Sequence, residues 1–523
     1  MGLSETLASM RQGRSDWEGE SWARRWLWGE DDLGTGLREI ASMLRRLSRE
    51  AQVRRDESEA TTIGVWSDLL VLREHWMQKG DDDDQQRAPA VVEDVDRVDA
   101  CWRCSSAAYG YLVNKVFGLL PEEESEDDNV PLEEGEDVAD SLFEKTIDLR
   151  CPSIKKVLYS NLNRKPYDGV ARPNFFVAID DRKRCVVAVR GTLDIGDVLT
   201  DLVGKARSFV MDPKTEDTVI AAHAGIADAA DNTMTEAEDA ILTALAGDCD
   251  ELVFTGHSLG GGVALLCALQ TQDRVKTGDP RKDKLVKVIR KKKGKHFKVR
   301  AVAFSPPAVV SMVDQAQAKD LPDLESYYVD DDVVPTLSYR SILTFAAQLD
   351  RIDEVLPRLQ RLALILSKPI RGVLPLIGSR GEPPRFLFPP SQAAASSSSS
   401  SSLLVRTLDP VLTETYQESI RLAEGDPEAP LSSIPGKVVR LSPSKKGAFV
   451  DPIIAPQIII KDRLLADHLP NAVQAALDDL LLAPPPEKKS KPQVIAVARA
   501  VTCPSAESIV VNATPTDDQE MSI

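Results

Sequence analysis

The clearest hydrophobic pattern of the chain lies between residues 252 and 269. An apolar run at residues 252–254 leads into a Gly-x-Ser-x-Gly motif centred on Ser258, and an apolar helical pattern follows at residues 263–269. This order predicts a buried strand, a sharp turn and a helix. The glycines on both sides permit a strained turn that lifts the serine hydroxyl above the sheet. We therefore predict that Ser258 is a nucleophile; a chance occurrence of the motif is the alternative, and its surroundings argue against it.

Other apolar segments predict the rest of a sheet. Residues 174–179 and 185–190 have the composition of two strands joined by the polar turn at residues 180–184. Residues 299–304 and 325–329 predict two more strands. Strands that alternate with helical segments are typical of a mostly parallel sheet. The chain is thus predicted to have an α/β fold of the α/β-hydrolase kind.

Two segments interrupt this predicted domain. Residues 277–298 carry a basic cluster at residues 290–293. A helix that leaves the serine turn runs toward the other end of the sheet, so this insertion is expected opposite the active site. We expect a solvated loop there, and a membrane-binding or regulatory role is the alternative.

The second interruption, residues 336–433, leaves the sheet from the carboxyl end of a strand, beside the active site. It contains a helical pattern at residues 352–366 and a serine run at residues 396–402. Such a run buries no apolar surface, so we expect it to be disordered. A flexible gate or phosphorylation segment and an inert surface loop are both open interpretations.

The amino-terminal part differs in composition from the rest. All seven tryptophans lie between Trp17 and Trp102. We predict a helical, Trp-rich region at residues 1–100, a catalytic domain at residues 101–475 and a carboxyl-terminal extension at residues 476–523. Trp22 and Trp26 share a helical face, which is either packed on the enzyme or placed in a lipid headgroup layer.

Composition and charge limit the partners and the location. The 523 residues carry a net charge of −18, which argues against a nucleic-acid partner. The chain shows no apolar run of membrane-span length and no signal core, so we expect a cytoplasmic protein without a transmembrane segment. Seven scattered cysteines predict reduced thiols, and the pair Cys101 and Cys104 is expected to pack within a helix rather than hold a metal. The first six residues fit the pattern for myristoylation of Gly2.

The general base follows from chain order. An α/β hydrolase presents its triad in the order serine, acid, histidine. Of the five histidines, His75 and His223 precede the serine, His257 lies inside the motif and His296 lies in the basic insertion. Only His468 comes late enough, after a strand-like apolar segment. We therefore predict that His468 is the base.

The acid comes from a cluster of three carboxylates. Asp330, Asp331 and Asp332 end the predicted strand at residues 325–329, where a loop would reach the active site. One of them is expected to orient the imidazole and to stabilise it once protonated. Chain order alone does not choose among the three.

These motifs together resemble the class 3 lipases. The similarity is carried by five ordered segments, residues 189–192, 223–226, 256–261, 331–335 and 467–468. The most similar branch is that of the sn-1-specific diacylglycerol lipases, which likewise have a long insertion between acid and histidine. Residues 107–110 and 435–441 also resemble segments of that branch. The resemblance covers residues 107–475 apart from the two insertions.

The resemblance has implications for the site and the reaction. It implies that Asp332 is the acid and that Thr192 and the backbone N–H of Leu259 form the oxyanion hole. It implies a serine lipase that hydrolyses acyl esters of glycerolipids, diacylglycerol or triacylglycerol, through an acyl-enzyme and without metal or organic cofactor. A phospholipase A1 or galactolipase and a catalytically silent lipid-binding scaffold are the alternatives.

The route to lipid is a separate expectation. Membrane-anchored members of that family have transmembrane helices before the catalytic domain, and this chain shows no such segment. We therefore expect peripheral contact with a membrane or lipid droplet through local apolar surface. The candidates are residues 17–28 and residues 203–220, which correspond to the lid of the smaller family members and include Val203 and Phe209.

Overall fold

The computed structural model describes most of the region between residues 62 and 482. The described residues are 62–79, 89–121, 136–162, 172–192, 206–211, 218–293, 297–311, 323–356, 397–424, 426, 430–443, 447–450, 457–461 and 463–482. The helices are α4 (Thr62–Lys79), α5 (Val95–Ala107), α6 (Tyr111–Val116), α7 (Glu136–Arg150), α9 (Ala224–Ala246), α10 (Leu259–Thr277), α11 (Lys284–Lys293), α13 (Tyr339–Val355), α15 (Ser397–Glu424) and α16 (Pro470–Leu482), with 3-10 turns η3 (Val334–Thr336) and η6 (Ala466–His468). The strands are β1 (Ile154–Ser160), β2 (Phe175–Asp180), β3 (Arg184–Val189), β4 (Ala206–Met211), β5 (Thr218–His223), β6 (Glu251–His257), β7 (Lys298–Phe304), β8 (Val310–Ser311), β9 (Leu324–Val329), β10 (Ser432–Ser433), β11 (Lys437–Ser442) and β12 (Gly447–Val450).

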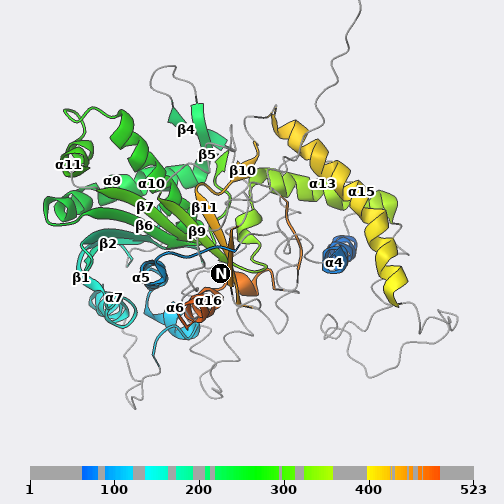
Figure 1. The fold of residues 1–523 in the computed structure, drawn as a ribbon, viewed down its shortest axis with the longest axis horizontal. Helices are drawn as coiled ribbons and strands as arrows, with labels where there is room; N and C mark the ends of the chain where they lie inside the picture. The colour runs from blue at the N-terminus through cyan, green and yellow to red at the C-terminus, as the bar shows by residue number, and fades with distance from the viewer. Residues whose placement is uncertain are drawn as a thin grey trace, which may run out of the picture. The chain divides into compact units, whose positions relative to one another are not determined.

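An eight-stranded sheet forms the centre of the fold, in the order β1-β2-β3-β6-β7-β9-β11-β12 (Figure 1). The five inner strands from β3 to β11 are parallel, while β1, β2 and β12 pair antiparallel at the two edges. The predicted α/β class with a mostly parallel sheet is confirmed. The strands predicted on the apolar runs correspond to β2, β3, β7 and β9 within one residue at each end, and to β6, which extends three residues further than its apolar run.

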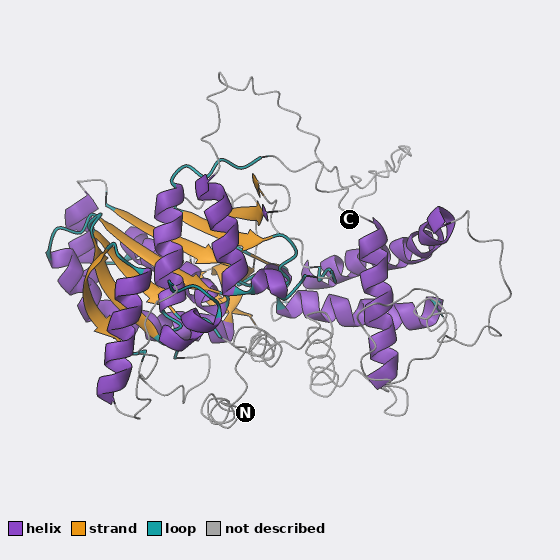
Figure 2. Ribbon diagram, turned by 90° about the horizontal axis from the view of Figure 1, so that it is seen from below, coloured by secondary structure: helices purple, strands orange, loops and turns teal. Residues whose placement is uncertain are grey.

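Helices cover both faces of this sheet (Figures 1 and 2). The alternation along β6 shows how the faces are divided. Leu252 and Phe254 join the core beneath α9 and α10, whereas Val253 points to the other face and packs with Trp102 of α5. Burial of one such side chain stabilises the fold by about 1.5–3 kcal/mol. Cys101 is buried in the same α5 interface, which confirms the prediction of helix packing for this cysteine pair.

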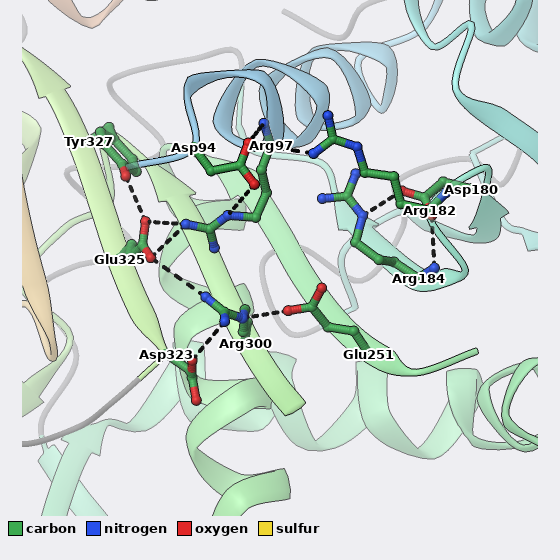
Figure 3. A network of polar contacts seen from close by, with 10 residues as sticks. All are labelled: Asp94, Arg97, Asp180, Arg182, Arg184, Glu251, Arg300, Asp323, Glu325 and Tyr327. Carbon is green, nitrogen blue, oxygen red and sulfur yellow. Dashed lines mark hydrogen bonds and ion pairs between the residues drawn. The ribbon is translucent and has the colours of Figure 1, made fainter. Parts of the chain in front are cut away.

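A network of paired charges ties the strand starts together, at the end of the sheet opposite Ser258 (Figure 3). Arg300 on β7 forms ion pairs with Glu251 at the start of β6 and, at 3.9 Å, with Glu325 on β9. Arg97 of α5 donates to both carboxylate oxygens of Glu325, at 2.8 and 3.0 Å, and Tyr327 donates to the same group at 2.6 Å. The side chains of Arg97, Arg300 and Glu325 are only 12%, 16% and 17% exposed, so these pairs hold α5 on the sheet with little screening by water.

The first insertion differs from the expected solvated loop. It contains α11, whose apolar side chains Leu285, Val286 and Ile289 are buried. Their spacing places them on one helical face, and that face packs on α9 and α10. Lys292 donates to the carbonyls of Gly247 and Cys249, at 2.7 and 2.8 Å, just beyond the end of α9. The loop prediction is therefore wrong for residues 284–293, which form a packed helix. Its basic residues are compatible with this, because the cation of Lys292 satisfies backbone carbonyls beyond the end of α9.

The second insertion is helical where the structure describes it. α13 begins at Tyr339 and ends at Val355, so the helix predicted at residues 352–366 starts much earlier; residues 357–396 lie outside the described part. α15 packs against α13 and α4 through Leu404, Leu408 and Leu412, which recur every fourth residue and are buried.

The serine run was expected to have no ordered structure, but in the structure residues 397–402 form the first turns of α15. The leucine-bearing part of the helix supplies the packing, and serine has only a moderate helix penalty.

The structure also describes parts of the candidate lid segment and the segment before His468. β4 and β5, which overlap residues 203–220, pair antiparallel within a small sheet of order β10-β8-β5-β4. Residues 457–460 are irregular rather than a strand, although Ile458 and Ile460 are buried. The position beside β11 at the sheet edge is already taken by β12.

The remaining predictions for the ends of the chain are not addressed by the structure. Gly2, the Trp22 and Trp26 face and residues 483–523 lie outside the described residues. Helix α5 spans the predicted boundary at residue 100. Among the helices of the described ranges, none combines the length and apolar character that a membrane crossing requires.

Candidate active site

Ser258 occupies the sharp turn between β6 and α10. Its φ is 56° and its ψ is −131°, a left-handed conformation that is strained for a side chain with a Cβ. The turn is possible because its neighbours are glycine. A Cβ on Gly256 would lie 2.3 Å from the carbonyl oxygen of Gly260, and a Cβ on Gly260 would lie 2.4 Å from that of Val189. The predicted strand, turn and helix around the serine are confirmed.

The structure brings the predicted base and one carboxylate to this serine. His468, in η6, places its Nε2 2.9 Å from the Oγ of Ser258. Its Nδ1 lies 3.0 and 3.2 Å from the two carboxylate oxygens of Asp332, which follows β9. The backbone N–H of Val334 donates to Asp332 Oδ1 at 3.0 Å and fixes the carboxylate. All three side chains are buried, so their mutual hydrogen bonds are little weakened by solvent.

The neighbouring carboxylates point to other partners. Asp331 accepts a hydrogen bond from Lys461 at 3.1 Å, and Asp330 lies 3.4 Å from a guanidinium nitrogen of Arg440. Only Asp332 of the three contacts the imidazole within the described residues. The tertiary arrangement therefore distinguishes carboxylates that chain order leaves equivalent.

Asp467 joins the loop of the base to the loop of the acid. Its Oδ2 accepts from the backbone N–H of Asp331 at 3.0 Å, and its Oδ1 accepts from Arg463 at 2.8 Å. Burial raises the pKa of this carboxyl to about 6, against the opposing hydrogen bonds and the nearby guanidinium. The contact holds the two loops together directly beside the triad arrangement.

The residues predicted for the oxyanion hole lie in adjoining segments. Thr192 follows the end of β3, and Leu259 is the first residue of α10, where its N–H has no acceptor within the helix. The two segments approach closely, because a Cβ on Gly191 would lie 2.2 Å from the carbonyl oxygen of His257. Donation by Thr192 and Leu259 to a reacting oxygen stays a prediction.

The other histidines have different surroundings. His223 caps α9 and accepts from the N–H of Ile226 at 3.3 Å. His75 is buried in α4, 3.6 Å from Asp409 of α15, and burial lowers its pKa to about 4. His296 lies outside the described residues. His257, set aside by chain order, is hydrogen-bonded both to Tyr109 and to the main chain of His468.

The arrangement as a whole defines a class of protein. A serine on a strand-to-helix turn, a carboxylate after a later strand and a histidine on a final loop, on a mostly parallel sheet, are the features of an α/β hydrolase. Such a set can transfer an acyl group through the serine oxygen.

Comparison with known proteins narrows this class. Residues 186–341 match the sequence profile of the family described as Lipase (class 3). Diacylglycerol lipase-beta of Mus musculus is 33% identical over 191 residues, which are 36% of this chain and 25% of that protein. Diacylglycerol lipase-alpha of Rattus norvegicus is 24% identical over 193 residues, 35% of this chain and 16% of that protein. The predicted resemblance to class 3 lipases, and to diacylglycerol lipases among them, is confirmed for this part of the chain.

The matched region is a limited share of these relatives, a quarter of the first and less of the second. Among solved structures, the Lip2 lipase of Yarrowia lipolytica aligns over 48% of this chain and 76% of its own, with 16% identity and a TM-score of 0.31.

Proposed function

We propose that this protein is a serine lipase that hydrolyses acyl ester bonds of glycerolipids, with diacylglycerol or triacylglycerol as substrate. The observation that carries the proposal is the hydrogen-bonded series from Asp332 through His468 to the hydroxyl of Ser258. The profile match and the similarity to diacylglycerol lipases support the same reaction. The alternatives, a phospholipase A1 or galactolipase and a silent scaffold, become outcomes of the experiment below.

The proposed reaction has two acyl-transfer steps. In the first, His468 Nε2 takes the proton from Ser258 as its Oγ attacks the ester carbonyl, and Asp332 stabilises the imidazolium. The negative oxygen is held by the N–H of Leu259 and by Thr192, and each donor contributes about 3 kcal/mol to the transition state. The imidazolium then protonates the departing alcohol oxygen. In the second step a water, deprotonated by His468, attacks the acyl-serine, and the proton returns to Ser258 with release of the fatty acid.

The burial of Ser258 bears on how a lipid substrate reaches the nucleophile. Ser258 has no exposed surface, so a substrate contacts Oγ only after a covering segment moves. We place this movement in residues 203–220, where Phe209 on β4 is partly buried against the core and stacks with Arg207. An opened hairpin would present apolar surface to a membrane or lipid droplet. The proposed cytoplasmic location agrees with six buried cysteines that form no disulfide in the described residues.

One experiment tests the proposal at its centre. The purified protein is labelled with a fluorophosphonate probe and assayed on a panel of diacylglycerol, triacylglycerol, phosphatidylcholine and monogalactosyldiacylglycerol. We expect labelling that is lost in Ser258→Ala, with hydrolysis highest on one of the first two lipids. Highest rates on a phospholipid or galactolipid would favour the corresponding alternative. Absence of labelling in the wild type would favour the scaffold.

A further inference from the structure

A chain of hydrogen bonds runs beneath the triad through two residues that the reaction itself does not use. Tyr109, in the loop after α5, is buried, and its hydroxyl oxygen lies 2.8 Å from Nδ1 of His257. Nε2 of His257 lies 2.9 Å from the backbone oxygen of His468. Gly191 lies against the same hydroxyl, because a Cβ on Gly191 would lie 2.4 Å from the tyrosine oxygen. This chain joins the end of β3, the serine turn and the loop of the base.

The direction of each hydrogen bond follows from its acceptors. The carbonyl of His468 only accepts, so His257 carries its proton on Nε2 and donates it there. In a neutral ring Nδ1 is then the acceptor, and the hydroxyl of Tyr109 donates to it. In this arrangement both ring nitrogens of His257 and the hydroxyl of Tyr109 have hydrogen-bond partners only when His257 is neutral.

The surroundings keep His257 neutral. Its ring is enclosed by Trp102, with centroids 5.6 Å apart, and lies 4.8 Å from the ring of His468 at an angle of 32°. Burial, and then the charge that His468 can carry, lower the pKa of His257 well below the ordinary value. A cation at His257 would oppose formation of the His468 imidazolium. A neutral ring supports the base without competing with it.

We propose that Tyr109 and His257 are positioning residues that hold the main chain of His468, and the segment of Gly191 and Thr192, at the distances acyl transfer requires. The inference rests on the proposed function. His257 precedes Ser258 directly, so its bond to the His468 carbonyl fixes the base relative to the nucleophile. The base lies on the short turn η6, where such a bond restricts its position. Displacement of a reacting group by about 1 Å costs on the order of 100-fold in rate.

The test begins with Tyr109→Phe and a matched control. The variant removes only the hydroxyl, so His257 Nδ1 loses its partner. Tyr327→Phe removes an equally buried tyrosine hydroxyl at the other end of the sheet. We expect Tyr109→Phe to lower the rate of fluorophosphonate labelling and kcat on a short soluble ester by about 10–100-fold, as loss of supporting hydrogen bonds does. KM should stay within about twofold, because substrate binding is untouched. Tyr327→Phe should keep both rates.

Two substitutions at position 257 separate the hydrogen bond to Tyr109 from the hydrogen bond to His468. In Gln the amide nitrogen reaches the place of Nε2 and can still donate to the His468 carbonyl. In Asn the amide oxygen lies near the place of Nδ1 and preserves only the bond from Tyr109. We therefore expect His257→Gln to retain about tenfold more activity than His257→Asn, because the link to His468 positions the base. Equal activities, or the opposite order, would overturn the inference.

A spectroscopic measurement decides the question without reference to turnover. The chain has five histidines, so 15N-labelled histidine gives few signals, and His257 is assigned by its disappearance in His257→Gln. We expect a neutral ring protonated on Nε2 throughout pH 5–9, with a shift of the Nδ1 resonance in Tyr109→Phe. An unchanged resonance, or a His257 that titrates in this range, contradicts the hydrogen-bond chain.

The outcomes for the inference and the proposed function are distinct. A wild type without Ser258-dependent labelling refutes both. A wild type that labels, together with Tyr109→Phe labelling at the same rate, overturns the inference alone. A rate loss in Tyr327→Phe equal to that in Tyr109→Phe would show a general stability effect and overturn it as well.

Discussion

Substitution of Asp332 by asparagine tests the identity of the acid with little change in shape. In the structure Asp332 receives the Val334 N–H on Oδ1 and lies 3.0 and 3.2 Å from Nδ1 of His468. An asparagine oxygen would remain on the Val334 N–H, which turns the amide NH2 toward the imidazole. That group favours the tautomer with its proton on Nε2, and such a ring cannot accept the proton of Ser258. The negative charge that stabilises the imidazolium is also lost.

The expected effect is large and specific. We expect kcat to fall on the order of 10⁴-fold, which corresponds to about 5 kcal/mol in the barrier. Asp331→Asn is the matched control, because Asp331 lies one residue away and pairs with Lys461 at 3.1 Å, with side chains 22% and 17% exposed. Its loss should cost less than about tenfold, as expected for a partly exposed ion pair worth roughly 1 kcal/mol.

Initial rates on a short soluble ester and fluorophosphonate labelling measure both variants, and urea unfolding verifies that each is folded. The reasoning is refuted if Asp332→Asn keeps more than about a tenth of the activity. It is also refuted if Asp331→Asn loses as much as Asp332→Asn.

Further predictions address the interface, the insertion and stability. Phe209→Asp should abolish the rise in activity that is expected when the substrate passes from monomers to aggregates, but it should leave hydrolysis of a short soluble ester unchanged. Equal losses of activity on both substrates would mean that Phe209 shapes the pocket or the core. Deletion of residues 391–402 should leave the protein folded by circular dichroism and its activity unchanged or higher, and insoluble protein would contradict this. Because the folded pKa of Asp467 is raised to about 6, the stability it contributes is present below its unfolded pKa and is lost as pH rises through 6. As pH rises from 4 to 7.5, the free energy of unfolding of Asp467→Asn should therefore increase relative to that of wild type by on the order of 2 kcal/mol, measured by urea unfolding. Parallel pH curves of the two proteins would disprove this. Glu325→Ala removes the carboxylate that accepts two hydrogen bonds from the buried Arg97 guanidinium and should cost about 3–5 kcal/mol in the same assay. Asp94→Ala removes the N-cap of α5 and an exposed ion pair and should cost only about 1 kcal/mol.

Two segments differ from the structure that their sequence predicts, and each has a physical reason. The run of four basic residues at 290–293 is typical of a solvated loop, but the buried Leu285 and Ile289 have a helical spacing. Lysine and arginine pack their stems and donate to helix-end carbonyls, so a basic run is compatible with a packed helix. Ile458 and Ile460 are buried without being part of a strand, because burial follows hydrophobicity while strand pairing needs a free edge.

Local sequence by itself determined the nucleophile turn, the buried strands and the histidine that could act as base. These features depend on glycine conformation, apolar periodicity and chain order, which can be read directly from the sequence. Chain order left three consecutive carboxylates equivalent and only the family resemblance pointed to Asp332; the contact of Asp332 with His468 is decided by the tertiary structure, because the two residues are 136 positions apart. The tertiary structure likewise brought Tyr109 to His257 and His257 to the His468 carbonyl, across 148 and 211 positions. Such contacts leave no periodic signal, since each is made by one hydrogen bond between segments that meet only when the sheet has formed.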